Sequence, residues 1–318
     1  MRILMHANSI TERGTTAALL DYADGLRNHG HEPVISWQNG HITNNPKFIT
    51  LIEENFRTLP YDEFSHLKIK SSDFDAAYFI KGGEYDGKLL DLEKNLVHVV
   101  FQNYDPHGNK YFYVSKWLAQ RVQKKFRVPQ ELRPLGFVPH IVNLPKQRKD
   151  MRSALGIPKS ATVGIRIGGF TTFDIKFVHK GVRFALFKNR NLYFVFINTQ
   201  KFISHPRAIF IDAISDNQLK SDYLSSADFF LHARSQGESF GIAILEAMSL
   251  GVPVLAWEGG LDMNHTELLS PTSLYSGFFD LIDKIQSITQ YSDTQLNYEV
   301  SLQYRPETVM KSFIKNLH

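Results

Sequence analysis

Two glutamates eight residues apart, Glu238 and Glu246, stand at and just inside the start of a predicted helix. Glu238 lies in the stretch Gly237-Glu-Ser-Phe-Gly241, which follows an apolar run and a short polar loop. Glycine lets a backbone approach a ligand closely, and the free amides of a first helical turn favour an anion. Eight residues at about 3.6 per turn bring Glu246 back near the face of Glu238. Two such carboxylates could hold sugar hydroxyls on either side of a bound phosphate.

A plainer interpretation of the same spacing needs no ligand. Glu238 would cap the helix N-terminus, and Glu246 would be a solvated helix residue. Glu246 stands between Leu245 and Ala247 in a helix that is apolar nearly all round. An unpaired carboxylate is costly there, which favours the ligand interpretation.

Three further positions could serve a site. His107, in the stretch Asp105-Pro-His-Gly108 after a predicted strand, could bind a sugar or move a proton, although Pro and Gly also fit a plain turn. Gly14 lies between the first strand and its helix, and His232 and Arg234 close another strand. Asp73 and Asp75 have metal-site spacing but are more typical of a polar strand entry. We therefore expect no obligatory metal and no cofactor.

Short β-rich runs alternate with helical patterns along the chain, which is typical of a parallel α/β protein. Thr15–Asn28 has apolar positions on one helical face and ends at Gly30, so the chain opens with a βαβ unit. The predicted strands are Arg2–Ala7, Pro33–Trp37, Ala76–Ile80, Val97–Phe101 and Tyr111–Val114, then Thr162–Ile167, Leu192–Ile197, Ala208–Ile211, Asp228–His232 and Val252–Ala256.

The stretch 138–150 holds two prolines and clustered charges, so we interpret it as a linker. It divides the chain into two doubly wound domains, residues 1–140 and 150–295. Residues 296–318 form a C-terminal helix, expected from about Pro306 to Leu317 and packing back towards the first domain. Ligands of such sheets bind beyond the carboxyl ends of the strands, so two facing domains would make a cleft.

Composition narrows the classes of function. The chain has 318 residues and no cysteine, which excludes disulfides, thiolate catalysis and thiolate-bound metal clusters. Its net charge of +4 is too small to name nucleic acid as a partner. No apolar run is long enough for a transmembrane helix or a signal peptide, so cytoplasm is the expected compartment. No G-x-G-x-x-G motif follows a strand, which disfavours a nicotinamide dehydrogenase.

A family resemblance emerges around residues 223–260. Three neighbouring stretches carry it: Tyr223-Leu-Ser-Ser-Ala-Asp, then Glu238 through Glu246-Ala-Met to Gly251-Val-Pro-Val, and finally Gly259-Gly260. Together they resemble the donor-site motif of the glycogen-synthase-like retaining glycosyltransferases, the glycosyl transferases group 1 family. In the first half, the stretch from Leu26 to Val34 resembles a helix-end signature of the two-Rossmann (GT-B) transferases. The resemblance implies a GT-B fold and a nucleotide-diphosphate-sugar donor such as a UDP- or GDP-sugar.

The resemblance also implies roles for single residues. Glu246 would bind the ribose hydroxyls and Glu238 would sit beside the transferred sugar in the catalytic centre. The amides around Ser239, Phe240 and Gly241 would contact sugar and diphosphate, and Gly14 would face the diphosphate. An Arg and a Lys would neutralise the departing diphosphate, and the candidates are Arg166 and Lys180.

The chain departs from the family pattern at two places. A longer insert separates Arg166 from Lys180, so Lys176 could take the role of the lysine. After Gly260 the usual Glu is missing, and either Asp262 or His265 could complete that loop.

The segment 116–152 holds ten basic and two acidic residues. It could meet an anionic membrane, a lipid-phosphate acceptor or DNA, or it could be a solvated helix face followed by a polar linker. Trp117, Leu118, Val122 and Phe126 are expected in the core rather than in a membrane.

The sequence thus predicts a metal-independent retaining glycosyltransferase that moves a sugar to an acceptor hydroxyl on a glycan, a lipid-linked or a protein-linked acceptor. It would be cytoplasmic, with peripheral membrane contact as an option. A DNA-base glycosyltransferase and a non-catalytic nucleotide-sugar binder are the alternatives.

Overall fold

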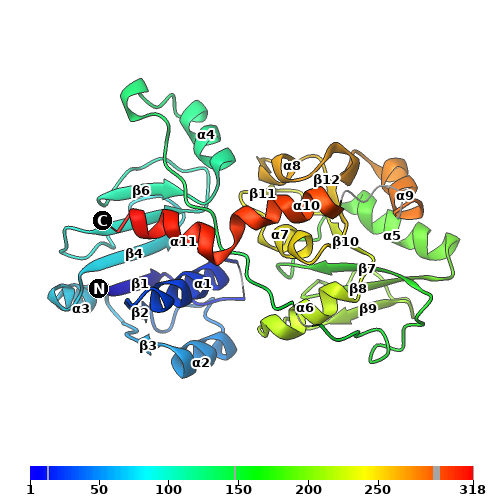
Figure 1. Ribbon diagram of the computed structural model, residues 1–318, viewed down its shortest axis with the longest axis horizontal. Coiled ribbons are helices and arrows are strands. Elements are labelled where there is room, and N and C mark those ends of the chain that lie inside the picture. The colour runs from blue at the N-terminus through cyan, green and yellow to red at the C-terminus, as the bar shows by residue number, and fades with distance from the viewer. Residues whose placement is uncertain (13, 147, 289–293, 318) are drawn as a thin grey trace. The chain divides into compact units, whose positions relative to one another are not determined.

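The computed structural model describes residues 1–12, 14–146, 148–288 and 294–317. The chain divides into two compact units, one formed by Met1–Ile141 with Tyr304–His318 and the other by Val142–Gln303. Each unit contains one six-stranded, all-parallel sheet flanked by helices (Figure 1). The predicted α/β class with two doubly wound sheets is confirmed. No described helix is both long and apolar enough to cross a membrane.

The sheet of the first unit has the strand order β3-β2-β1-β4-β5-β6. Successive side chains of a strand face opposite sides, so Tyr78 packs towards one helical layer and Phe79 towards the other. The elements are β1 (Arg2–Ala7), α1 (Gly14–Asn28), β2 (Glu32–Ser36), α2 (Pro46–Asn55), β3 (Arg57–Thr58), α3 (Phe64–Lys68), β4 (Ala76–Lys81), β5 (Asn95–Val99), β6 (Lys110–Tyr113), α4 (Lys116–Lys125) and α11 (Pro306–Lys315).

Helix α11 belongs to the first unit although it ends the chain. Phe313 stacks on Tyr22 of α1 with ring centroids 4.6 Å apart and meets Tyr78 of β4 edge-on at 5.2 Å. Met310 lies against Gly25, where a Cβ would come within 2.5 Å of its sulfur. The predicted tail holds two helices rather than one, because Pro306 has no amide hydrogen to continue a helix and instead begins a new one.

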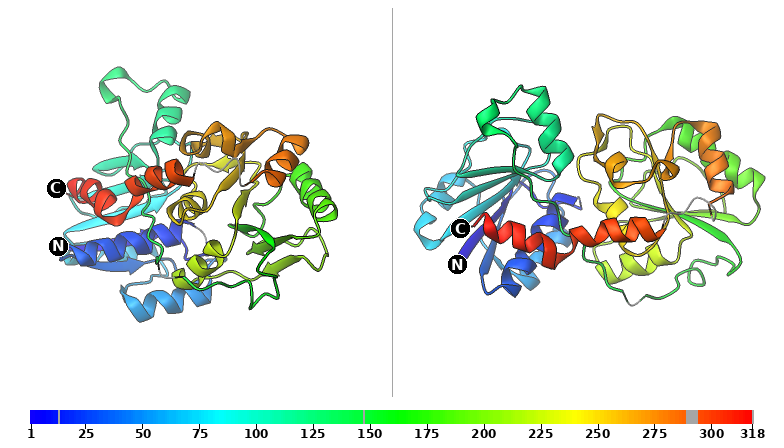
Figure 2. Two further views of the ribbon diagram at one scale, coloured as in Figure 1. Left: turned by 45° about the vertical axis from the view of Figure 1, so that its right-hand side comes forward. Right: turned by 45° about the horizontal axis from the view of Figure 1, so that its top comes forward.

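The sheet of the second unit has the order β14-β12-β10-β7-β8-β9. Helices α5 and α9 cover one face, over a core rich in phenylalanine, and α7 packs on β10 and β12 (Figure 2). The elements are β7 (Thr162–Ile167), α5 (Lys176–Lys188), β8 (Leu192–Ile197), β9 (Ala208–Ile211), α6 (Asn217–Ser225), β10 (Phe229–His232), β11 (Gly237–Glu238), α7 (Ile242–Ser249), β12 (Val254–Trp257), β13 (Asp262–Met263), α8 (Asn264–Leu268), β14 (Leu274–Tyr275), α9 (Phe278–Gln286) and α10 (Thr294–Ser301).

Four predicted strands, those at β1, β7, β8 and β9, agree with the structure at both ends. The edge strands β3 and β14 have two residues each and escape the sequence pattern, because two residues carry no periodicity.

Candidate functional site

Each sheet has one place where the chain changes direction across it. In the second unit the chain builds β7, β8 and β9 outwards and then returns to place β10 on the other side of β7. Crevices beyond the carboxyl ends of two such strands are the usual ligand sites of doubly wound sheets. Arg166 near the end of β7 and His232 at the end of β10 therefore mark the place where a site is expected.

Glu238 reaches this edge through a two-residue strand. β11 pairs in parallel with β13, with Gly237 opposite Asp262. Gly237 has φ +73°, and a Cβ there would lie 2.0 Å from the carbonyl oxygen of Asp262. Only glycine fits this close approach, so the glycine before Glu238 fixes where its carboxylate stands.

Two neighbouring side chains hold the Glu238 carboxylate. His232 Nε2 lies 2.9 Å from one oxygen, and Arg234 Nη1 donates to the other at 3.1 Å. Burial alone would raise the pKa of Glu238, but the hydrogen bond and charge of His232, with the charges of Arg234 and His265, lower it below its ordinary value. Glu238 is therefore an anion fixed at both oxygens.

His265 lies beside His232 in this group. Its ring centroid lies 5.5 Å from that of His232, and its Nε2 lies 2.8 Å from the carbonyl oxygen of Trp257. Burial, and then the charge of His232, lower the pKa of His265 to about 4. Asp262 instead accepts a hydrogen bond from Gln236 Nε2 at 3.1 Å. Both residues stand beside β11, and which of them completes the loop stays a prediction.

The stretch Ser239–Gly241 turns the chain from β11 into α7. Gly241 is the N-cap residue, has φ +94° and has no side-chain cap. The turn is tied by Asn264 Nδ2, which donates to the carbonyl oxygen of Phe240 at 2.6 Å. Glu238 lies three residues before this N-cap, and its two carboxylate oxygens contact His232 and Arg234.

Glu246 is buried in α7, with 7% of its surface exposed. Lys220 Nζ, from α6, donates to its Oε1 at 2.8 Å. Because Glu246 is buried and paired, its interpretation as a solvated helix residue is wrong. The lysine that neutralises it lies 26 positions earlier in the chain, and no motif in the sequence points to this pair.

Arg166 has a structural task in this arrangement. Its Nη1 donates to the Asn198 carbonyl oxygen at 2.8 Å and to Thr199 Oγ1 at 2.7 Å. Its Nη2 donates to the Gly169 carbonyl oxygen at 2.8 Å and to Thr172 Oγ1 at 2.7 Å. Burial lowers its pKa to about 10. Its guanidinium ties two loops at the carboxyl edge together, and its contact with a diphosphate stays a prediction.

Lys176 and Lys180 are both exposed on α5, at its first residue and one turn later. The loop before this helix is bound to the site, because Asp174 Oδ1 accepts the Ser235 amide at 2.7 Å. Arg234, next to Ser235, is a partly exposed guanidinium that contacts Glu238. The sequence indicates Arg234 only as the end of a strand. The structure shows that its guanidinium lies beside Glu238, at the carboxyl edge of the second sheet.

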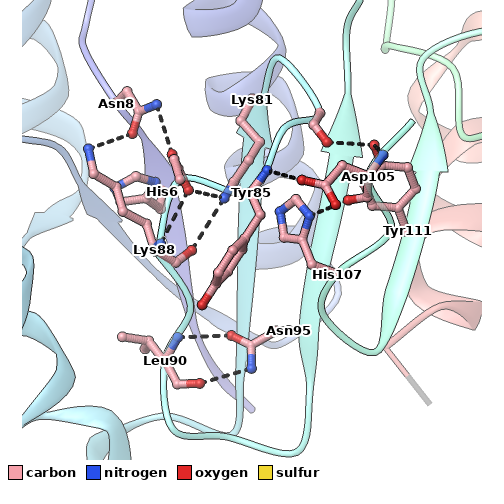
Figure 3. Close-up of polar contacts among 12 residues, drawn as sticks. His6, Asn8, Lys81, Tyr85, Lys88, Leu90, Asn95, Asp105, His107 and Tyr111 are labelled. Atoms are coloured by element: carbon pink, nitrogen blue, oxygen red, sulfur yellow. Dashed lines mark hydrogen bonds and ion pairs between the residues drawn. The ribbon is translucent and has the colours of Figure 1, made fainter. Parts of the chain in front are cut away.

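The two residues predicted from the first unit lie apart, one at the start of a helix and one in a loop. Gly14 is exposed at the first position of α1. His107 follows β5, and its ring lies between those of Tyr85 and Tyr111, with centroids 5.1 and 5.5 Å away. His107 Nδ1 lies 2.6 Å from the carbonyl oxygen of Asp105 (Figure 3). A catalytic role for His107 stays a prediction.

The first unit has a polar cluster of its own, where β1 and β4 part beside the chain reversal (Figure 3). The Lys81 side chain is only 2% exposed, and its Nζ donates to Asp86 Oδ1 at 2.6 Å. Asn8 Nδ2 donates to the other Asp86 oxygen at 3.3 Å, and Lys88 Nζ donates to Asn8 Oδ1 at 2.9 Å. Burial alone would raise the pKa of Asp86, but the bond to Lys81 and its charge lower it.

His6 lies beneath this cluster. Its Nε2 lies 2.9 Å from the Tyr61 hydroxyl oxygen, and burial, then the charges of Lys88 and Lys81, lower its pKa to about 3. Its Nδ1 is buried without a hydrogen-bond partner in the part of the chain that the structure describes. The sequence pattern does not predict this cluster. The signals that point to it are the lysine that ends a buried strand and the two glycines after it.

Comparison with known proteins agrees with this architecture. Residues 200–261 match the family model described as Glycosyl transferases group 1. No curated protein matches the chain. Among solved structures, Anabaena HepE in complex with UDP-glucose is similar at a TM-score of 0.75 and 14% identity, covering 100% of this chain and 99% of that one.

Two further solved structures are similar over nearly the full length. The glycosyltransferase from Rickettsia africae has a TM-score of 0.72 at 13% identity, covering 99% of this chain and 97% of that chain. Sucrose-phosphate synthase from Thermosynechococcus elongatus has a TM-score of 0.70 at 13% identity, covering 99% and 98%. The predicted resemblance is thus confirmed: the chain has the GT-B fold of these glycosyltransferases, and residues 200–261 match the glycosyl transferases group 1 model.

Proposed function

We propose that the protein is a glycosyltransferase that moves a sugar from a nucleotide-diphosphate donor to an acceptor hydroxyl, with retention of anomeric configuration. The observation that carries this proposal is the ionised Glu238 carboxylate, held by His232 and Arg234 at the chain reversal of the second sheet, within the segment that matches the family model. Retention rests on the family resemblance, and we assign no side-chain nucleophile.

The charge that must be stabilised in such a reaction develops on the departing diphosphate. Oriented cations and helix amides at that position lower the barrier, because they need no reorganisation as the charge appears. The first turn of α7 supplies amides with no partner inside the helix. Lys176 or Lys180 would add a mobile ammonium from α5, and Arg234 a guanidinium. Glu238 would orient the hydroxyls of the transferred sugar as their acceptor.

Glu246 would bind the nucleoside. A carboxylate has two acceptor oxygens, which suits the adjacent hydroxyls of a ribose. Lys220 pairs with this buried carboxylate at 2.8 Å before the nucleotide arrives, which offsets the cost of burying the carboxylate. The solved structure of HepE holds UDP-glucose, so a UDP-sugar is the first donor to test.

We place acceptor recognition in the first unit, at the cluster around Lys81, Asp86 and Lys88. This cluster stands at the carboxyl ends of β1 and β4, where a doubly wound sheet offers its ligand site. The acceptor would be a glycan, a lipid-linked or a protein-linked hydroxyl compound, with His107 as the candidate proton carrier. The reaction would need no cofactor besides the donor and no obligatory metal, and it would take place in the cytoplasm.

Thermal stabilisation by a panel of UDP- and GDP-sugars tests the donor site. A ligand at about 100 times its dissociation constant adds about 2.7 kcal/mol to the free energy of unfolding. We expect one nucleotide diphosphate sugar to stabilise the native chain and to lose this effect in Glu246→Ala. Glu267→Ala, an exposed glutamate on α8, is the matched control and should keep it. Stabilisation that survives Glu246→Ala would refute the assigned nucleotide site.

Turnover separates an enzyme from a non-catalytic binder. Donor hydrolysis without acceptor, followed by nuclear magnetic resonance of the released sugar, reports both activity and anomeric configuration. An inverted product would refute retention, and binding without hydrolysis or transfer would favour the binder. Loss of turnover with EDTA, restored by a divalent cation, would refute metal independence.

A further inference from the structure

Helix α4 of the first unit has a strongly basic exposed face. It buries Leu118, Ala119 and Val122 against the unit. Its exposed positions include four basic side chains and no acidic one: Lys116, Arg121, Lys124 and Lys125. The stretch 116–137 contains six basic residues and one acidic residue, Glu131.

Large apolar side chains are exposed beside these charges. After α4 the chain runs out in an arm that returns to β6 at Phe137, and Figures 1 and 2 show this arm standing away from the sheet. Phe126 is 41% exposed and Leu132 is 54% exposed. The core position predicted for Phe126 is wrong, because Phe126 follows the last turn of α4, where Arg127 takes a left-handed φ of +50°.

A second loop adds to the same surface. Phe101, after β5, is 54% exposed. Lys125 Nζ donates to the carbonyl oxygen of Gln102 at 3.3 Å, and the rings of Tyr104 and Phe126 lie 5.9 Å apart. These contacts bring the loop that carries Phe101 to the end of α4. We call the exposed side chains of residues 116–137, together with Phe101, the α4 patch.

The remaining basic residues of the segment 116–152 serve another purpose. They lie in the second unit or at its start. Arg152 Nη2 pairs with Asp228 at 2.9 Å, and Arg148 Nη1 donates to the carbonyl oxygen of Leu250 at 3.2 Å. The basic run of the sequence is therefore divided between the two units, and only its first part forms the α4 patch.

We propose that the α4 patch docks on an anionic lipid bilayer. Lysine and arginine near such a surface each increase partitioning about fivefold. Phe126, Leu132 and Phe101 would enter the interfacial layer, where apolar side chains leave water. A nucleic acid would use the charges, but its phosphate backbone offers these apolar side chains nothing. The combination of charge and exposed apolar surface favours the bilayer over DNA.

Sedimentation of the full chain with lipid vesicles tests this proposal. We expect binding to phosphatidylcholine vesicles that contain about 30% phosphatidylglycerol, and much weaker binding to phosphatidylcholine alone. Binding should fall when salt is raised from about 50 mM to about 500 mM, because the screening length shortens several-fold. The double variant Lys124→Gln/Lys125→Gln should reduce partitioning about 25-fold, and Leu132→Ser should reduce it without changing the charge.

The control variant removes the same charge elsewhere in the first unit. Lys47 and Lys70 are exposed, and Lys47→Gln/Lys70→Gln should bind vesicles like the native chain. Equal losses in the two double variants, or equal binding to neutral vesicles, would overturn the proposal. Binding to duplex DNA that is tighter than to vesicles and indifferent to Leu132→Ser would overturn it in favour of nucleic acid. Donor stabilisation should be unchanged in every variant, so failure here is distinct from failure of the proposed function.

Discussion

The two sheets reverse direction in the same way, yet the polar groups at their reversals differ in origin. Beside β7 and β10, a carboxylate is held by two partners from its own stretch of chain: His232 and Arg234 lie six and four residues before Glu238. Beside β1 and β4, the carboxylate of Asp86 is held by Lys81, five residues away, and by Asn8, 78 residues away. Both contacts of the Glu238 carboxylate are local, whereas the contact of Asp86 with Asn8 forms only after β1 and β4 have paired in the sheet.

This difference has an energetic side. Glu238 is ionised because its contacts with His232, Arg234 and His265 outweigh the effect of burial on its pKa. It is therefore a charged acceptor for a ligand in the folded protein. Lys81 is almost fully enclosed, and burial lowers its pKa even though Asp86 raises it. The second-unit group is thus suited to chemistry, and the first-unit cluster is coupled more tightly to the stability of its sheet.

The largest effect should come from Glu238→Gln. The amide keeps the shape but loses the charge and one acceptor, so we expect turnover to fall about 10²- to 10³-fold, as for loss of one preorganised polar group. Initial rates of donor consumption measure this, with Glu267→Gln as the matched control. Turnover within a factor of two of that of the native chain would contradict the catalytic role of Glu238, and with it the functional difference between the two regions.

Lys81→Met should act chiefly on stability. It leaves the Asp86 carboxylate, 29% exposed, without its ammonium partner, and breaking such a pair costs about 3 kcal/mol. Thermal and urea unfolding measure the loss. Lys88→Met removes an ammonium that contacts Asn8 and should cost about 1 kcal/mol. If the two variants are equally stable, the Lys81–Asp86 pair is not what holds this edge.

Two glycines with the same φ compare close backbone approaches in the two units. Gly237→Ala places a Cβ 2.0 Å from the Asp262 carbonyl oxygen, and Gly108→Ala places one 2.6 Å from that of Asn95. Both also impose a left-handed conformation on alanine, so we expect losses of about 2 kcal/mol, larger at Gly237. Gly40 has φ +64°, and a Cβ there would meet nothing within 4 Å. Gly40→Ala therefore serves as the control for the left-handed backbone without a close contact. An unfolding midpoint for Gly237→Ala equal to that of the control would contradict the close approach.

Mild acid should produce the smallest difference between the two regions, seen as a difference in stability between the two units. Buried His6 and His140 have pKa values of about 3 in the first unit, and His265 has about 4 in the second. Their pKa values are lowered on folding, so their contribution to stability is complete above about pH 6.5. It is lost as pH falls to about 4 for His265 and to about 3 for His6 and His140. At pH 5.5 each costs roughly 1 kcal/mol.

Hydrogen exchange followed by peptide mass between pH 7 and pH 5.5 measures this difference. After correction for the intrinsic pH dependence of exchange, peptides of the first unit should lose protection more than those of the second. The opposite order would show that the buried histidines do not control acid stability.

Sequence alone predicts the two-sheet α/β class and most central strands, because buried parallel strands are continuous apolar runs bounded by glycine and polar residues. It also predicts the neighbourhood of Glu238 and Glu246. The Gly237 turn, the strand before it and α7 after it form one continuous stretch of chain, so local spacing nearly fixes their geometry.

Only the tertiary structure decided which groups meet those residues. Three contacts depend on strands and helices brought together from distant positions: the pair of Lys220 with Glu246, the loop contacts of Arg166, and the ring contact of His265 with His232. The same holds for the cluster of His6, Lys81 and Asp86, and for the division of the basic segment between two units. Sequence spacing specifies neighbours along one element, whereas side-chain partners across a sheet edge depend on strand order, which emerges only when the whole sheet packs.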